Sequence, residues 1–164
     1  MNSNTSIQDV FKLIEEKYKD DSFVLIATAK DNVPTVRAVD SFFYDGSFWI
    51  ATDKRCNYVQ EIMSNPFTMI SDGAHNRFWC KAVLRGHPLD EANKNIREIY
   101  TKKFSWYFDV NNEESKETCY IKVTPYKGYI HKDKIGYTFN GTDDTIVVDS
   151  IKHHIDAKIV PFFE

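Results

Sequence analysis

The stretch that decides the fold is residues 23–62, which reads FVLIATAKDNVPTVRAVDSFFYDGSFWIATDKRCNYVQEI. Three runs within it are rich in apolar and β-branched residues and therefore favour strands: 23–29, 34–44 and 48–52. Asp31-Asn32 and Asp45-Gly46 separate the runs, and these residue types tolerate the positive φ angles of tight turns. The pattern predicts an antiparallel three-stranded meander that buries one face, with a short helix after it.

The order of motifs here resembles that of the flavin mononucleotide (FMN)-binding split-barrel family, which includes pyridoxamine 5'-phosphate oxidase. A strand of the form LATA, here IATA at 26–29, leads through a turn to a P-x-V-R strand at 34–37. A D-G hairpin, a strand ending in Ala-Thr at 51–52 and a helix leading to Asn-Pro at 65–66 follow. The resemblance covers residues 22–132. It implies a mainly β fold, a Greek-key-like antiparallel β-barrel with a few helices.

The chain length of 164 residues is enough for one domain with a substantial core. We expect a single split-barrel domain over 1–164, with an N-terminal helix at 1–20, the barrel core at 22–132 and a C-terminal extension at 133–164. The helix is expected because apolar residues recur at helical spacing after the capping pair Ser6 and Asp9. In the extension, 135–140 and 145–149 favour a hairpin around Asn140-Gly141.

The barrel core contains further predicted elements. Strands are expected at 67–71 and 77–86, and two successive strands at 117–125 and 126–132, separated by a break at Pro125. A helix is expected over 88–103, with an apolar stripe formed by Ala92, Ile96, Ile99 and Tyr100. The aromatic run FSWYF at 104–108 favours packing in the core or the wall of a ligand pocket.

Composition excludes several classes of partner and location. The formal net charge of −3 gives no general attraction to nucleic acid or to an anionic membrane surface. No apolar run reaches transmembrane length, and the first 21 residues lack the layout of a signal peptide. The 3 cysteines are widely spaced and form neither a disulfide framework nor a zinc pattern. A reducing cytoplasm is therefore the expected compartment.

Arg37 is the most informative charged residue because it lies in the middle of an apolar strand. An unpaired buried cation is costly, so its guanidinium needs either an anionic partner or an exposed face. One reading is a solvated residue or an ion pair within the protein. The other is a phosphate clamp, since guanidinium can bind phosphate oxygens bidentately. The resemblance favours the second, because Arg37 matches the family arginine that contacts the flavin phosphate.

The loop after the third strand is the second candidate for phosphate binding. The resemblance gives Thr52 a phosphate contact and implies a basic pair just before the following helix. Asn57 and Tyr58 occupy those two positions instead, which removes charge from the site. Lys54 and Arg55 are candidates to replace the pair, with Asn57 as a polar contact; alternatively, both cations are ordinary loop charges. The helix N-terminus would add backbone amides and a positive dipole end.

The remaining expected flavin contacts also come from the resemblance. Ala38, Val39, Ile50 and Ala51 would approach the flavin through their backbone and side chains. Family members commonly form dimers with flavin between the subunits, so we expect a homodimer. In such a dimer Trp79 and Lys81, on the basic face of the strand 77–86, would line the flavin pocket across the interface. The alternation of this strand is equally compatible with a solvated outer face.

The leading functional hypothesis is an FMN-dependent oxidoreductase that acts on an unknown small molecule, with a small-molecule electron donor and acceptor. No catalytic residue is indicated, and no metal site is expected, although His153 and His154 are adjacent near the C-terminus. Two alternatives remain. One is a non-catalytic or heme-binding barrel, in which a histidine would serve as axial ligand. The other is a cofactor-free dimeric interaction module, which the Asn57-Tyr58 departure favours.

Overall fold

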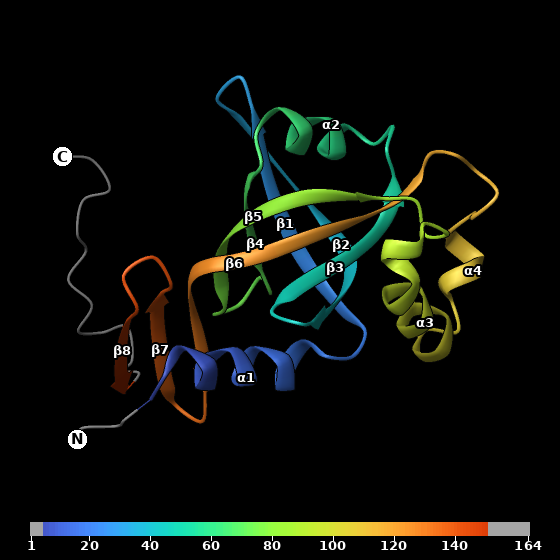
Figure 1. The fold of residues 1–164 in the computed structure, drawn as a ribbon. Coiled ribbons are helices and arrows are strands. Elements are labelled where there is room, and N and C mark those ends of the chain that lie inside the picture. The colour runs from blue at the N-terminus through green and yellow to red at the C-terminus, as the bar shows by residue number, and fades with distance from the viewer. Residues whose placement is uncertain (1–4, 151–164) are drawn as a thin grey trace.

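The computed structural model describes residues 5–150, and Figure 1 shows how its strands and helices are arranged. The strands are β1 (Ser22–Lys30), β2 (Val33–Tyr44), β3 (Ser47–Asp53), β4 (Phe67–Ser71), β5 (Arg77–Gly86), β6 (Thr118–Lys132), β7 (Ile135–Asn140) and β8 (Thr145–Ser150). The helices are α1 (Ile7–Tyr18), α2 (Asn57–Ser64), α3 (Lys94–Lys103) and α4 (Tyr107–Val110), with a 3₁₀ turn at Glu91–Asn93 before α3.

The strands form one antiparallel sheet in the order β3-β2-β1-β4-β5-β6-β7-β8. β3 pairs with β6 as well, and this second pairing closes β1 to β6 into a barrel. The order is Greek-key-like because β4, after the connection through α2, returns to lie beside β1. The expected mainly β barrel with a few helices is confirmed, and β7 and β8 extend it as the hairpin expected from the sequence.

The three-stranded meander forms with the turns that the sequence indicates. Asp31 and Asn32 have φ angles of 52° and 63°, and Asp45 and Gly46 have φ angles of 48° and 69°. Two consecutive residues with positive φ match the right-handed twist of the flanking strands, which is why these residue types favour tight hairpins. β1 pairs with β2 from Ser22↔Ser41 to Lys30↔Val33.

β2 and β3 separate soon after their hairpin. They pair only through Phe42↔Trp49, Phe43↔Phe48 and Tyr44↔Ser47. Beyond these pairs β3 continues beside β6, while β2 continues beside β1. The edge of β2 at residues 33–41 that faces away from β1 therefore has no strand partner in the described part of the chain. This opening in the barrel wall positions the candidate site.

Helix α1 lies along one end of the barrel (Figure 1). Ser6 caps it through the expected capping box, in which the Ser6 hydroxyl accepts from the Asp9 amide and the Asp9 carboxylate accepts from the Ser6 amide. Its apolar stripe buries Val10, Ile14 and Tyr18 against the barrel interior. The predicted helix is thus confirmed, and its role is to complete the core at the barrel end.

One expected strand break is wrong. β6 runs without interruption through Pro125, which pairs with Cys80 of β5, while Lys127 pairs with Trp79. Tyr126 is therefore an extra residue on β6, and the register shift marks a β-bulge at this point. A bulge leaves ladder hydrogen bonds unmade locally, so a residue without a backbone N–H is tolerated there.

The helix expected over 88–103 is shorter than predicted. Its first residues form a turn and a 3₁₀ segment, so that α3 begins only at Lys94. Ala92 is exposed rather than part of the apolar stripe, whereas Ile96 and Tyr100 are buried as expected. The side chain of Asn93 explains the late start, because its amide donates to the carbonyls of Arg85 and His87 and ties this segment to the end of β5.

The organisation of residues 1–164 as a single domain stays a prediction. Residues 151–164, which include His153 and His154, lie outside the described part of the chain. Within residues 5–150, no three His, Cys, Asp or Glu side chains gather in a way that would hold a metal ion. In the same range no helix is long and apolar enough to cross a membrane.

Candidate functional site

A cavity of about 540 Å³ lies where β2 and β3 separate. This volume is within the range of roughly 300–1,000 Å³ typical of small-molecule sites. Residues from β2, β3 and the loop after β3 form one side of the cavity. Seven of them were expected from the sequence to contact a flavin: Arg37, Ala38, Val39, Ile50, Ala51, Thr52 and Arg55. Residues that are distant in sequence are thus brought together at one opening.

The other expected contacts lie elsewhere. Lys54 and Asn57 flank the cavity-lining residue Arg55 in sequence but do not line the cavity themselves. Trp79 and Lys81 lie on β5, on its outer face. Lys81 borders a separate hollow formed with Phe67, Val83 and Tyr126, among others. Within one chain, Trp79 and Lys81 are therefore not part of the cavity that Arg37 lines.

The opposite wall of the cavity was not predicted from the sequence. That wall comes from the segment after α3 and from the start of β6, and it is formed by Trp106, Val110, Asn111, Asn112, Ser115 and Thr118. Asp40, Asp53, Cys56 and Tyr58 complete the lining on the barrel side. The only signal for the wall was the aromatic run at 104–108, for which a pocket wall was one of two readings. The polar loop after it carries no motif that points to a ligand.

The Arg37 guanidinium is already engaged by groups of the protein. Its Nη1 donates to the Thr28 hydroxyl at 2.5 Å and to the Ile26 carbonyl at 3.4 Å, and its Nη2 donates to the Thr35 hydroxyl. Nη2 also lies 3.4 Å from Oε2 of Glu61, which forms an ion pair with it. Both charged side chains are largely buried, with 24% and 14% of their side-chain surface exposed.

Glu61 is held as firmly as the arginine that it faces. The Thr35 hydroxyl donates to its Oε2 at 2.6 Å, and the Thr28 hydroxyl donates to the same oxygen. These hydrogen bonds, together with the positive charge of Arg37, lower the pKa of Glu61 from its ordinary value. The carboxylate is therefore ionised at neutral pH. Of the two readings of Arg37, an ion pair within the protein describes the structure as it stands.

Tyr58 occupies one of the two positions where the resemblance implies a basic residue. The Arg37 guanidinium carbon lies 5.2 Å from the centre of its ring, in a cation–π arrangement. Burial raises the pKa of Tyr58 to about 12, so the phenol is neutral. Tyr58 thus covers Arg37 with an aromatic face and adds no charge to the cavity.

The second arginine of the cavity is also paired. Nε and Nη2 of Arg55 donate to the Asp53 carboxylate at 2.9 and 2.6 Å, and the Arg55 amide donates to the same group at 2.8 Å. These hydrogen bonds lower the pKa of Asp53 to about 2. The charged lining residues are Arg37, Asp40, Asp53 and Arg55, so their formal charges cancel. The described lining of the cavity therefore carries no net formal charge.

Thr52 and the first turn of α2 supply neutral donors at the same end of the cavity. The Thr52 hydroxyl lies 3.8 Å from the sulfur of Cys56, the residue that precedes α2. Thr52, Cys56 and Tyr58 all line the cavity, so the N-terminal turn of this eight-residue helix borders it. Backbone N–H groups in a first helical turn have no acceptor four residues back and can bind an anion. Here the Val59 amide already donates to the Cys56 carbonyl at 3.0 Å, so the amides of Asn57 and Tyr58 are the candidate donors.

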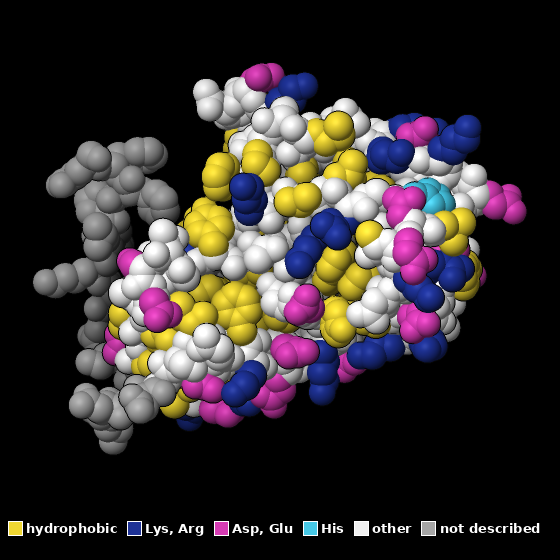
Figure 2. All heavy atoms as spheres, viewed as in Figure 1, with side chains coloured by type: hydrophobic (Ala, Val, Ile, Leu, Met, Phe, Trp, Pro, Cys, Tyr) yellow, Lys and Arg dark blue, Asp and Glu magenta, His cyan; other side chains and the backbone are white. Residues whose placement is uncertain are grey.

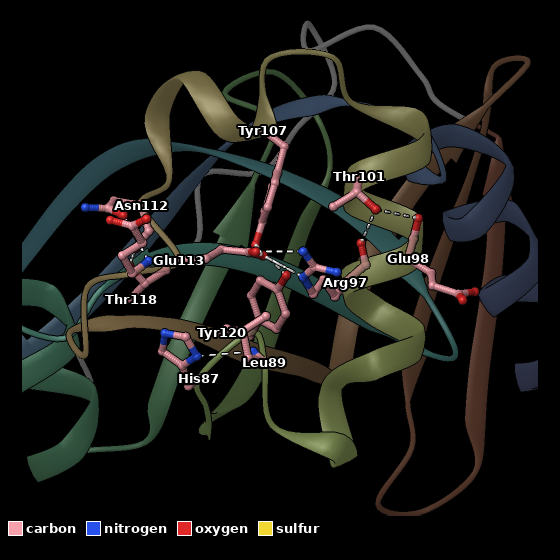
Figure 3. Close-up of polar contacts among 11 residues, drawn as sticks. His87, Leu89, Arg97, Glu98, Thr101, Tyr107, Asn112, Glu113, Thr118 and Tyr120 are labelled. Carbon is pink, nitrogen blue, oxygen red and sulfur yellow. Dashed lines mark hydrogen bonds and ion pairs between the residues drawn. The ribbon is translucent and has the colours of Figure 1, made fainter.

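Figure 3 shows the polar contacts that hold the opposite wall in place. Arg97 of α3 donates through Nε and Nη2 to the Glu113 carboxylate at 2.9 and 2.8 Å, and the Tyr107 hydroxyl donates to the same carboxylate at 3.0 Å. The Thr118 hydroxyl donates to the Asn112 carbonyl. Burial alone would raise the pKa of Glu113, but the hydrogen bonds from Arg97 and Tyr107 outweigh it and lower the pKa. The wall is therefore a fixed part of the fold.

No protein-family model matches the chain, and no curated protein matches its sequence. Solved structures do match. A pyridoxamine 5'-phosphate oxidase-related, FMN binding protein from Nostoc punctiforme aligns over 79% of this chain and 87% of its own, with 14% identity and a TM-score of 0.51. A FAD-binding protein from Mesorhizobium loti aligns over 76% and 92%, with 13% identity and a TM-score of 0.54.

The heme storage protein HutZ from Vibrio cholerae aligns over 74% of this chain and 91% of its own, with 11% identity and a TM-score of 0.56. The fold is therefore the split barrel. The resemblance expected from the sequence motifs is confirmed at the level of the fold. Identities this low show the architecture alone, and the three proteins bind different cofactors according to their descriptions. The ligand of this split barrel has to be argued from its own cavity.

Proposed function

We propose that this split barrel is an FMN-binding flavoprotein and acts as an oxidoreductase on a small molecule. The observation that carries the proposal is the cavity between β2 and β3, because it is lined by Arg37, Ala38, Val39, Ile50, Ala51 and Thr52. These are residues for which the family resemblance implies flavin contact. Split barrels described as FMN binding and FAD-binding support a flavin as the ligand class.

Each side of the cavity has a part in this proposal. The free edge of β2 at Ala38 and Val39, where alternate residues turn their N–H and C=O away from β1, would offer backbone groups to the polar edge of a flat ring, and Ile50 and Ala51 of β3 would offer apolar contact. Thr52 and the first turn of α2 would donate to phosphate, with Arg37 as the nearby cation. When bound, the flavin would supply the redox chemistry between an electron donor and an acceptor.

We also propose that the protein is a homodimer with the flavin at the interface. The outer face of the barrel supports this, because a cross-strand row joins Val36 to Ala27, Ala27 to Met69 and Met69 to Trp79. Val36 has 64% of its surface exposed. In the view of Figure 2, hydrophobic side chains lie over the barrel strands, while the side of the molecule along α1 is mostly charged. A dimer formed through the outer face would bring Trp79 and Lys81 toward a partner's cavity.

A cytoplasmic location is part of the same proposal. Cys56, Cys80 and Cys119 are all free thiols, and Cys80 and Cys119 are buried. Free cysteines are typical of reducing compartments, and this supports the proposed location.

Heme binding is the second candidate, and HutZ, described as a heme storage protein, is the observation in its favour. A heme iron needs an axial ligand. None of the described residues that line the cavity is a histidine. The ring of His87 contacts the carbonyl of the lining residue Ser115 at 3.1 Å, so this imidazole is already engaged. A cofactor-free interaction module is the third candidate, consistent with the balanced charges of the cavity.

The visible absorption spectrum of the purified protein, before and after addition of FMN and gel filtration, separates the three candidates. We expect paired flavin bands that stay with the protein, at one flavin per chain. A Soret band in place of the flavin bands would indicate that the ligand is heme. A protein that stays colourless and does not retain added FMN would overturn the proposal and leave the interaction module.

A further inference from the structure

Glu61 has a position that the proposed flavin site does not explain. It lies on α2, and its carboxylate faces the guanidinium that the site needs for phosphate. The described hydrogen-bond partners of this carboxylate are Thr28 of β1, Thr35 of β2 and Arg37. A carboxylate with two hydroxyl donors and an arginine is a built arrangement rather than a chance surface pair.

The same arrangement draws Arg37 to the border of the cavity. Arg37 lines the cavity, but its polar partners Thr28, Thr35 and Glu61 do not. The guanidinium is therefore directed toward the β1–α2 side. A phosphate that enters the cavity has to share these donors with Glu61 or displace it, and two anions close to one cation repel each other.

Among the described lining residues, no other cation compensates for this competition. Arg55, the other lining cation, forms a bidentate pair with Asp53. Tyr58 is neutral and stacks on Arg37, and Asn57 carries no charge. The affinity of the site for a phosphate group therefore depends strongly on how tightly Glu61 holds Arg37.

We propose that Glu61 is a specificity-determining residue that competes with phosphate for Arg37 and so lowers the preference of the cavity for FMN over riboflavin. The inference rests on the flavin site proposed above. It follows that the flat ring, which both flavins share, provides most of the recognition in the wild-type protein, and that the phosphate contributes less than an unopposed arginine would allow.

The test compares FMN with riboflavin in the wild-type protein and in Glu61→Gln. Glutamine keeps the length of the side chain and an oxygen that accepts from threonine, but it removes the negative charge. We expect the ratio of the riboflavin Kd to the FMN Kd to rise about tenfold, because a charge-assisted contact between Arg37 and phosphate becomes available. The riboflavin Kd itself should change by less than about twofold, because riboflavin lacks the group that Glu61 opposes.

Two further variants complete the design. Glu61→Ala replaces the carboxylate by a residue that favours helix, and it should also raise the ratio of the riboflavin Kd to the FMN Kd. With two variants, poor folding of one of them does not decide the outcome. Glu98→Gln is the matched control: it makes the same substitution at an exposed position on α3, where Glu98 pairs only with Lys102 among the described residues. The control should leave the ratio unchanged.

A second readout uses inorganic phosphate, so that it does not depend on flavin binding. At constant ionic strength, phosphate should raise the Tm of Glu61→Gln more than that of the wild-type protein. If neither flavin binds but this difference is observed, the flavin proposal fails while the competition at Arg37 stands. An unchanged FMN-to-riboflavin ratio, together with equal phosphate effects on the two proteins, would overturn the inference.

Discussion

The hydroxyl oxygens of Tyr107 and Tyr120 lie 2.6 Å apart in the buried junction between α4 and β6. The ring of Tyr100 stacks on that of Tyr120 at a centroid distance of 5.2 Å. Burial raises the pKa of both hydrogen-bonded tyrosines, so both phenols are neutral and each can donate only one proton. The pair connects Glu113, and with it the far wall of the cavity, to the barrel.

Tyr107→Phe should therefore lower the free energy of unfolding by about 1–3 kcal/mol, because it leaves the buried Tyr120 hydroxyl without its partner and removes one of the donors to Glu113, which keeps Arg97. Urea titration of the wild-type and variant proteins measures this change. Tyr126→Phe, which removes a hydroxyl from an exposed position on β6, is the control and should change the unfolding free energy by less than about 0.5 kcal/mol. Equal effects of the two substitutions would contradict a role for the tyrosine pair.

The Arg37–Glu61 ion pair predicts a specific dependence of stability on pH. The pKa of Glu61 is lowered in the folded protein, so this carboxylate binds a proton less readily when folded than when unfolded. The stabilisation is complete above its ordinary pKa of 4.5 and is lost as the pH falls through the lower, folded value. Unfolding free energies measured by urea titration from pH 7 to pH 3 should fall more steeply for the wild-type protein than for Glu61→Gln.

The difference in unfolding free energy between the wild-type protein and Glu61→Gln should accordingly become smaller as the pH decreases. Glu98→Gln, with its partner Lys102 at the surface, should follow the wild-type profile. Parallel profiles for the wild-type protein and Glu61→Gln would mean that Glu61 does not contribute through its charge.

The proposed homodimer is tested at Val36. This side chain is exposed in one chain and lies in the cross-strand row that includes Trp79. Val36→Lys should cost the monomer little, but burying a lysine charge at the interface would strongly oppose association. Sedimentation should show a dimer for the wild-type protein and a monomer for the variant. Val147→Lys, an exposed valine on β8, is the control and should remain dimeric; dimers of both variants would place the interface elsewhere.

The parts of the fold that could be predicted from sequence are those set by local chemistry. Asp45-Gly46 specifies its hairpin because only a few residue types accept two consecutive positive φ angles. Pro125 shows the opposite case. Proline usually ends a strand, but here β6 accommodates it through a bulge at Tyr126, opposite the step from Trp79 to Cys80 of β5, and no local pattern reports the register of a partner strand.

The candidate site likewise has residues that local sequence predicts and residues that only tertiary packing brings to it. Sequence identified Arg37 as a residue that needs an anionic partner, and the strand motifs selected the lining residues of β2 and β3. It could not identify Glu61, which is 24 residues away along the chain and reaches Arg37 only because α2 packs over β1. The wall at Trp106 and Asn111 depends in turn on how the segment between β5 and β6 folds back onto the barrel.

Arg37→Ala tests whether this arginine contributes to phosphate binding despite its internal partner. We expect the variant to bind FMN about tenfold more weakly while its affinity for riboflavin changes by less than about twofold, because only FMN carries a group that the guanidinium can reach. Fluorescence titration of both flavins measures the two constants. Arg85→Ala, at an exposed position on β5, is the matched control for loss of a positive charge.

Removing Arg37 also leaves the Glu61 carboxylate without its cation, so the variant should unfold at a lower urea concentration than the wild-type protein. The effect of this lower stability can be separated from the loss of a phosphate contact. A distorted cavity would weaken the binding of FMN and of riboflavin to the same extent. An equal loss for FMN and riboflavin would therefore assign Arg37 a purely structural role, and an unchanged FMN affinity would remove it from the phosphate site.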